Sequence, residues 1–308
     1  MKQFIKKLVQ KALTPLENEL KASFQQELVG LKDFSFDNSL KQAQVSQTLL
    51  SQHYQSLLNS NTKLPNFEET GFRMFSQNDE DGYLLYIFAL IGATNRRVVE
   101  ICAGNGIECN AANLIINHGW IGLLFDGNEA NIEQGQSFYS QCRDTRTWPP
   151  RLVHAWINAE NVNDLIRENG VSGKIDLLSV DMDGIDYWIW KAIDTIQPRV
   201  VVLEYQDILG PDQAVTVPYN PDFVAEFGEY GPDYCGASLA AFVKLGKEKG
   251  YRLVGCSNYG INAFFIRDGI AEDILPEIPT QDCFWHPKVQ HGIKYRLPNV
   301  IDYPWVEV

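Results

Sequence analysis

Short apolar runs alternate with amphipathic segments from about residue 79 onward, and this alternation constrains the fold more than any other feature of the chain. Apolar runs that alternate with helices indicate βαβ crossovers, in which a parallel sheet is buried on both faces. The sequence therefore predicts five parallel strands. They are RVVEICA (97–103), IGLLFDG (121–127), RLVHAWI (151–157), IDLLSVD (175–181) and RVVVLEY (199–205).

The segments between these runs have helical periodicity, and the order changes after the fifth run. A stretch of 30 residues with four prolines follows, then a helical pattern, then two β runs separated by SNYG, which is a hairpin signal. We therefore expect an α/β fold, a Rossmann-like doubly wound and mostly parallel seven-stranded sheet with an antiparallel terminal hairpin. The predicted helices cover residues 107–118, 129–141, 161–169, 185–196 and 237–249, and the hairpin covers residues 250–268.

The same patterns divide the chain into three parts. Residues 1–71 read as a helical N-terminal extension, which we expect to be a docking or oligomer-contact element. Residues 72–268 hold the sheet domain, and residues 269–308 form an aromatic and proline-rich tail that wraps it. A homo-oligomer is therefore one expectation for the assembly.

Composition excludes several classes of partner. The formal net charge of −13 repels phosphate backbones, so we expect no nucleic-acid partner. No apolar run approaches the length needed to cross a bilayer, and lysines interrupt the apolar pattern of residues 1–13, so we expect no stable membrane association. The six cysteines contain no CxxC pair and read as reduced thiols. Together these features predict a cytoplasmic protein.

The stretch VVEICAGNGIECN (98–110) places Gly104 and Gly106 after the first predicted strand, with Glu100 and Glu108 on either side. Glycines at this position let a backbone approach a nucleotide-like ligand closely. The dinucleotide fingerprint GxGxxG is poorly met because Cys109 takes the third glycine position, and Glu108 would repel a pyrophosphate. A nicotinamide-dependent oxidoreductase or epimerase stays an alternative, since Asp126 lies near the position of a ribose-binding acid.

Carboxylates gather at the strand ends of the predicted sheet. Ligands of open α/β sheets bind in the crevice outside the carboxyl ends of the strands. Crowded carboxylates are costly unless a cation satisfies them. S-adenosylmethionine brings a sulfonium and an ammonium and no phosphate, so it suits the glycines and the acids together. The acids concerned are Glu100, Asp126, Asp181, Asp183 and Glu204.

Four segments resemble the FkbM-type S-adenosylmethionine-dependent methyltransferases, over roughly residues 72–268. They are FSQNDEDG (75–82), VVEICAGNGIECN, LLFDGN (123–128) and IDLLSVDMDGIDYWIW (175–190). The resemblance implies methyl transfer, usually to a hydroxyl of a sugar or another small natural product. It also implies that Glu100, Gly104 and Gly106 form the cofactor loop, that Asp126 binds the ribose, and that Asp181 lies beside the methyl group. Cys102 and Asn105 stand where members of the family vary.

Methyl transfer to an alcohol needs a base or a metal, because an alcohol is a poor nucleophile near neutral pH. Asp181, Asp183 and Glu204 are the best-placed carboxylates for this catalytic role. They could act as the base, or they could jointly hold a divalent cation that acidifies the hydroxyl. The sequence leaves both alternatives open. We expect the adenine of the cofactor near WINAEN (156–161), with Ala159 and Glu160 as its contacts.

The segment 206–235 is long and has little periodicity, which is typical of functional lids and of linkers. It is too aromatic for a linker and directly follows the strand that ends near Glu204, so we predict a lid over a small-molecule acceptor. An oligomer contact is the alternative for this segment. For the whole chain, a non-catalytic module with a methyltransferase-like fold is a further alternative, because a fold does not fix a function.

Overall fold

A computed structural model gives the structure of the protein and describes residues 14, 21, 35–228 and 231–308. The chain divides into two units, residues 1–49 and residues 50–308. Residues 35–49 of the first unit are helical, and so are residues 50–59 of the second. Most of the helical extension predicted before residue 35 lies outside the described residues.

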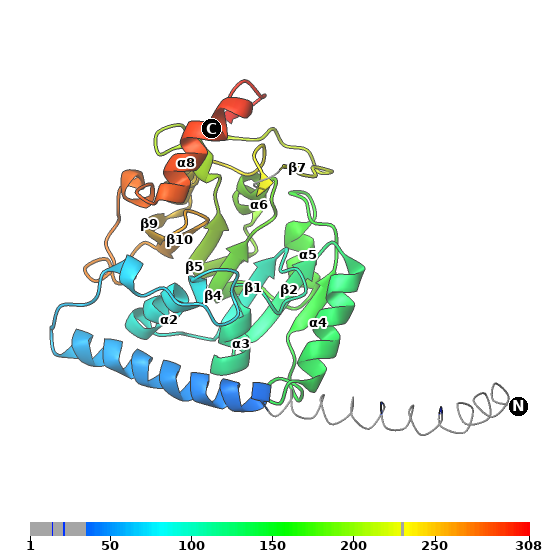
Figure 1. Ribbon diagram of the computed structural model, residues 1–308, viewed down its shortest axis with the longest axis vertical. Helices are drawn as coiled ribbons and strands as arrows, with labels where there is room; N and C mark the ends of the chain where they lie inside the picture. Colours follow the sequence, from blue (N-terminus) through cyan, green and yellow to red (C-terminus); the bar gives the residue numbers. More distant parts are fainter. Residues whose placement is uncertain (1–13, 15–20, 22–34, 229–230) are drawn as a thin grey trace, which may run out of the picture. The chain divides into compact units, whose positions relative to one another are not determined.

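The second unit contains the predicted seven-stranded sheet, with strand order β3-β2-β1-β4-β5-β10-β9 (Figure 1). The first five strands pair in parallel, whereas β10 runs antiparallel to both β5 and β9. The Rossmann-like fold and its terminal hairpin are thus confirmed. The strands are β1 (Arg97–Ile101), β2 (Ile121–Asp126), β3 (Arg151–His154), β4 (Gly173–Val180), β5 (Ile196–Glu204), β9 (Tyr251–Cys256) and β10 (Asn262–Arg267).

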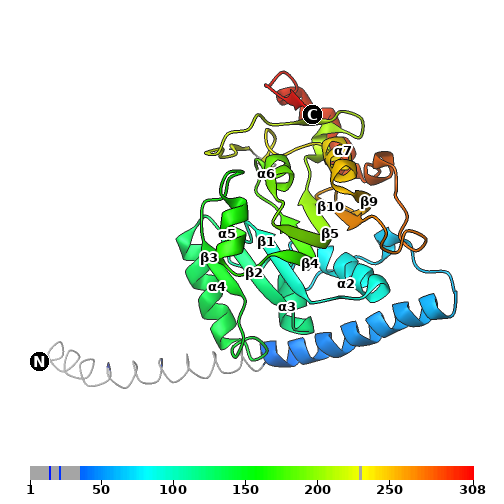
Figure 2. The ribbon, with the colours of Figure 1, turned by 180° about the vertical axis from the view of Figure 1, so that it is seen from behind.

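Helices cover both faces of this sheet (Figures 1 and 2). Alternate residues of β10 mark the two faces, because successive side chains of a strand point in opposite directions. The ring of Phe264 contacts Tyr83 of α2 with centroids 5.3 Å apart, whereas Phe265 contacts Trp190 of α6 at 5.4 Å. One face carries α2 (Glu80–Ile91), α3 (Ala112–His118) and α4 (Glu129–Gln141), and the other carries α5 (Val162–Glu168), α6 (Asp186–Ala192) and α7 (Leu239–Lys249).

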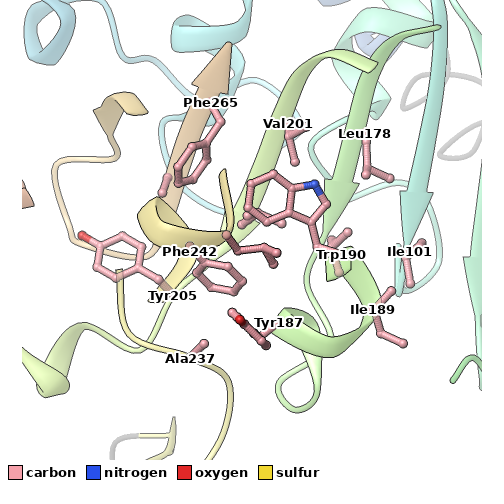
Figure 3. Close-up of a cluster of buried hydrophobic side chains, with 14 of the residues drawn as sticks. Ile101, Leu178, Tyr187, Ile189, Trp190, Val201, Tyr205, Ala237, Phe242 and Phe265 are labelled. Atoms are coloured by element: carbon pink, nitrogen blue, oxygen red, sulfur yellow. The ribbon is translucent and has the colours of Figure 1, made fainter. Parts of the chain in front are cut away.

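The largest hydrophobic cluster lies between the sheet and the α5–α7 layer (Figure 3). Trp190 is fully buried there, with ring centroids 6.2 Å from Phe242 and 5.9 Å from Tyr251. Buried aromatic side chains contribute large apolar areas to a core. This packing fixes α6, and the loop that enters α6 carries Asp181 and Asp183.

Two predicted helices, each of 12 residues, are shorter by five residues, at 7 residues each. The helix predicted at 107–118 begins only at Ala112, because the Glu100 carboxylate accepts hydrogen bonds from the backbone N–H groups of Asn110 and Ala111. The helix predicted at 185–196 ends at Ala192, since β5 already begins at Ile196.

The C-terminal tail packs against the segment 206–235. Strand β11 (Val306–Glu307) pairs antiparallel with β6 (Val215–Thr216), and Arg296 forms an ion pair with Asp233. The tail also contains η3 (Thr280–Cys283), α8 (Pro287–Tyr295) and η4 (Leu297–Asn299). The segment also contains η2 (Asp207–Leu209), β7 (Phe227–Gly228) and β8 (Gly231–Pro232), while η1 (Phe67–Glu69) precedes the sheet.

Two expectations about composition can be compared with the structure. All six cysteines are free, and five of them are buried, as expected for reduced thiols. Within residues 35–228 and 231–308, no helix combines the length and the apolar character that a membrane span requires.

Candidate active site

The loop between β1 and α3 has an unusual backbone. Cys102, Gly104 and Gly106 have φ angles of 60°, 56° and 68°, so three alternating residues adopt the left-handed conformation. Glycine adopts this conformation freely, whereas a side chain makes it cost about 1 kcal/mol or more. The carbonyl of Gly106 accepts a hydrogen bond from the buried Tyr139 hydroxyl, which ties the loop to α4.

A cavity of about 310 Å³ opens beside this loop, and we call it the loop cavity. Cys102, Ala103 and Gly104 of this loop line it. Five acidic side chains also line it, and no lysine, arginine or histidine is among the described residues that do so. A cavity with this lining favours a cationic ligand and disfavours phosphate. The acids are Glu100, Glu108, Asp126, Asp181 and Asp183.

Two of these acids are held by backbone and side-chain donors. Both oxygens of the buried Glu100 are engaged, by Asn110 N at 3.0 Å and by Ala111 N at 2.7 Å. Asp126 ends β2 and uses only Oδ1, which accepts from Asn128 N and Asn131 Nδ2. Within the described residues no donor binds Asp126 Oδ2, so this oxygen is free for a ligand. Glu100 therefore shapes the loop, whereas Asp126 offers an acceptor.

The motif FSQNDEDG contributes Gln77 to the lining of the loop cavity. Asp81 lies in the first turn of α2, and its Oδ2 accepts from the backbone N–H groups of residues 74, 75 and 76. This fixes the turn that carries Gln77 into the cavity lining. Glu80, also buried, accepts from Asn262 Nδ2 at 3.0 Å. Asn262 lines the cavity, and its buried Oδ1 has no partner among the described residues.

A second cavity of about 330 Å³ lies on the other side of Asp181 and Asp183, and we call it the tail cavity. Its lining includes Glu204 at the end of β5 and residues from the segment 206–235 and the C-terminal tail. Lys288 of the tail binds Asp207 at 2.8 Å. The tail therefore supplies part of the wall, in addition to covering the domain.

The two cavities share a wall formed by Gln77, Asp181 and Asp183. Asp181 follows β4, and its carboxyl group is hydrogen-bonded to that of Glu204 on the neighbouring strand. Burial, together with the neighbouring acids, raises the pKa of Asp181 to about 7, although its hydrogen bond with Glu204 acts in the opposite direction. Burial and repulsion from Asp181 raise the pKa of Glu204 well above its usual range. The two carboxyl groups thus share a proton near neutral pH.

Asp183 and Asp186 complete this turn. Asp183 has a left-handed φ of 51°, and burial raises the pKa of its carboxyl group. Asp186 holds the turn, because it accepts from Met182 N at 2.8 Å and from Gly184 N at 3.0 Å. Burial raises the pKa of Asp186 to about 6 against the effect of these two donors.

Asp176, in strand β4, is a carboxylate with a structural role, and its hydrogen-bond donors and its pKa differ from those of Asp181 and Glu204. Its oxygens accept from the N–H groups of Thr94, Asn95 and Arg96, and Arg199 lies 3.1 Å away. Burial alone would raise the pKa of Asp176, but these donors lower it below the usual value. Asp181 and Glu204 lack such donors among the described residues, so burial and the neighbouring acids determine the raised pKa of both carboxyl groups.

The structure does not bring every predicted residue into the cavities. Ala159 and Glu160 line neither of them. Ala159 N donates to the hydroxyl of Tyr219 at 3.1 Å, and this hydroxyl in turn donates to the Glu160 carboxylate. Both residues therefore hold the segment 206–235, and their contact with adenine stays a prediction. Gly106 shapes the loop without lining the loop cavity.

For a metal ion, the described part of the chain offers no group of three or more His, Cys, Asp or Glu side chains placed to hold one. Asp181, Asp183 and Glu204, which the sequence suggested as joint ligands, do not form such a group. Asp181 and Glu204 instead pair with each other.

Several residues of the two cavities were missed in the sequence. Gln77 lies within the motif FSQNDEDG, so its motif could have identified it. Asp186, which lines neither cavity but holds the turn beside them, lies within IDLLSVDMDGIDYWIW. Asn262 stands as a polar residue at the start of an apolar strand, which is a weaker signal. Lys288 and Arg296 lie in the tail, where nothing in the sequence connects them with the strand ends.

No protein-family model matches the chain, and no curated protein matches it. Solved structures are similar to part of it, and three of them follow. Magnesium protoporphyrin IX methyltransferase from Synechocystis PCC 6803 with bound S-adenosylmethionine is 11% identical, with a TM-score of 0.38 over 60% of this chain and 75% of that one.

The N-terminal domain of EvdMO1, with S-adenosylhomocysteine bound, is 15% identical over 64% of this chain and 88% of that one, with a TM-score of 0.39. The glycopeptide N-methyltransferase MtfA in complex with S-adenosylhomocysteine is 9% identical over 56% and 81%, with a TM-score of 0.35. These identities and scores are too low to show the function of this chain.

Proposed function

We propose that this chain is an S-adenosylmethionine-dependent methyltransferase that acts on a hydroxyl of a small molecule, such as a saccharide. The observation that carries this proposal is the wall of Asp181 and Asp183 shared by two cavities of similar volume. Group transfer needs two ligands whose reacting atoms meet. Here the loop cavity would hold the cofactor, and the tail cavity would hold the acceptor.

The loop cavity suits this cofactor, because the groups that line it can accept the hydrogen bonds that the cofactor donates. Asp126 Oδ2 has no donor within the described residues and suits the ribose hydroxyls. The buried Asn262 Oδ1 also has no partner and suits the ammonium of the methionine portion. The acidic lining suits a ligand that carries two positive groups and no phosphate. When bound, the cofactor supplies an electrophilic methyl group on a sulfonium.

The paired carboxyl groups of Asp181 and Glu204 suit the role of general base. A base works best when its pKa lies near the working pH, and burial raises the pKa of Asp181 to about 7. The ionised carboxylate oxygen of the pair would accept the proton of the acceptor hydroxyl. At the same time the hydroxyl oxygen would form a bond to the methyl carbon, and the bond between this carbon and the sulfur would break. Asp186 would position the turn that carries this base.

The segment 206–235 is proposed as the lid of the acceptor. Phe227, Pro232 and Cys235 of this segment line the tail cavity, whereas none of its described residues lines the loop cavity. The ring of Tyr219 lies 6.0 Å from Trp188, and the indole N–H of Trp156 donates to Pro221 O at 2.8 Å. These contacts support a lid that covers the methyl acceptor in the tail cavity and leaves the binding of the cofactor unchanged.

The dinucleotide alternative has a specific obstacle in this structure. A pyrophosphate would rest on the backbone N–H groups at the start of α3. The Glu100 carboxylate already occupies two of these groups, at Asn110 and Ala111. Glu108 adds a further negative charge at the same loop. An NADH titration checks this, since saturable binding would favour an oxidoreductase.

Calorimetry of the full chain with S-adenosylhomocysteine tests the proposal. We expect saturable binding that the Asp126→Ala variant weakens by about 10- to 100-fold, because a hydrogen bond to a charged acceptor contributes about 1.5–3 kcal/mol. Glu129→Ala is a matched control, since this acid lies three residues further on in α4 and lines neither cavity. An intact protein that binds no S-adenosylhomocysteine at high micromolar concentration would refute the proposal.

A further inference from the structure

The wall between the two cavities carries three carboxyl groups that lack a counter-ion, and we call them the junction cluster: Asp181, Asp183 and Glu204. Asp181 and Asp183 line both cavities, and Glu204 lines the tail cavity. Apart from the contact between Asp181 and Glu204, no hydrogen bond or ion pair engages their side chains within the described residues.

The charged neighbours of the cluster are already engaged. Lys288 and Arg296 line the tail cavity, but Lys288 binds Asp207 and Arg296 binds Asp233 at 2.6 Å. The buried acids nearest in the fold, Glu100 and Asp186, accept backbone N–H groups. Above the pKa of Asp181, about 7, the junction cluster therefore carries negative charge that no described side chain compensates. Such charge is costly in a partly buried place unless a ligand supplies the cation.

A methyl group can pass from one cavity to the other only at the wall that they share. If the proposed function holds, the sulfur that carries this methyl must approach that wall. This sulfur has a full positive charge before transfer and none afterwards, while the rest of the cofactor is unchanged. The charge at the sulfur is thus the main difference that the junction cluster can sense.

We propose that the junction cluster discriminates between S-adenosylmethionine and S-adenosylhomocysteine by the charge on sulfur, binding the first and releasing the second. This inference rests on the proposed function and adds a specific role to it. Attraction between the sulfonium and the carboxylates strengthens binding of the methyl donor, because charges interact more strongly in a partly buried place than in bulk water. Transfer removes the positive charge, and the product then leaves a cavity whose carboxylates no longer attract it.

Calorimetry with each of the two ligands on the full chain, at pH 8 and low salt, tests this inference. We expect the wild type to bind S-adenosylmethionine at least about tenfold more tightly than S-adenosylhomocysteine, a difference of about 1.4 kcal/mol. In Asp181→Asn/Glu204→Gln we expect this ratio to fall by about tenfold, through weaker binding of S-adenosylmethionine alone. Single substitutions should have smaller effects, because the remaining carboxyl group of the pair can carry the charge.

Two further variants make the result specific. Asp183→Asn removes one charge while keeping a residue that tolerates the left-handed backbone, so it is a second test with little risk to folding. It should lower the ratio as well. Glu129→Gln is the matched control, since this acid lies in the first turn of α4 and lines neither cavity. It should leave the ratio unchanged.

The outcomes separate the inference from the proposed function. Equal affinities of the wild type for the two ligands would overturn the inference but leave the cofactor assignment intact. The same holds if the preference persists in both Asp181→Asn/Glu204→Gln and Asp183→Asn. If neither ligand binds the intact wild type, the proposed function itself is wrong, and the inference fails with it.

Discussion

Neutralising Glu204 should make the unliganded protein more stable. The carboxyl groups of Asp181 and Glu204 lie against each other without donors from the described residues, so one of them must keep a proton when the chain folds. A Glu204→Gln substitution keeps the shape of the side chain and removes the repulsion. The introduced amide can also donate a hydrogen bond to Asp181.

The magnitude follows from the pKa of Asp181. A change from 3.8 to about 7 corresponds to about 4 kcal/mol at high pH. This is an upper bound, because burial causes the larger part of the shift and persists in the variant. We therefore expect Glu204→Gln to raise the free energy of unfolding by about 1–2 kcal/mol at pH 8. For a chain of this size this raises the Tm by roughly 2–4 °C.

The raised pKa of Asp181 also determines whether the stability of the protein rises or falls with pH. A carboxyl group with a raised pKa in the folded state contributes most to stability below its unfolded pKa, near 4, and this contribution is lost as the pH rises through about 7. The wild type should therefore lose stability over this range, and the variant should lose less. Thermal unfolding at pH 5.5 and at pH 8 measures the difference in Tm between the variant and the wild type at each pH.

Glu204→Gln should also lose most methyl transfer once an acceptor is known, since it removes one half of the base. A variant that is more stable and less active would be the mark of a site that is strained for function. The reasoning is refuted if the variant is less stable than the wild type at pH 8. It is also refuted if the gap in Tm is the same at both pH values. Glu129→Gln serves as the control, because this acid lies in α4 and lines neither cavity.

Three other perturbations address the parts around this pair. Cys102→Gly should raise the free energy of unfolding by about 1 kcal/mol in urea titrations, because φ is 60° there, whereas Cys102→Val should lower it. Gly82→Ala should lower the free energy of unfolding by about 3 kcal/mol and therefore the Tm, since a Cβ atom would lie 2.2 Å from Thr70 O and Phe72 N. An unchanged Tm would contradict this. Replacing residues 220–231 by a short Gly–Ser linker should leave the affinity for S-adenosylhomocysteine within a few-fold but remove methyl transfer, and full turnover in that variant would exclude a lid.

The sequence by itself determined the sheet and the acidic crevice. Each strand of the sheet is a local apolar run, and each crossover helix has its own periodicity, so neighbouring residues carry the information. The carboxyl ends of parallel strands meet at one edge, and this rule alone brings Asp126, Asp181 and Glu204 together. Helix ends were predicted less well. The start of α3 depends on Glu100, which lies in β1, ten residues before the Asn110 N–H that it binds.

Only the tertiary structure decided how the crevice is divided and what completes it. Gln77 enters both cavities because Asp81 fixes its turn, and Asn262 lies beside Glu80 although 182 residues separate them in the chain. Lys288 reaches the tail cavity because α8 packs against η2. Such placements depend on which distant surfaces pack together, and no local pattern records this. The same holds for the raised pKa of Asp181, since it arises from burial and from neighbours on other strands.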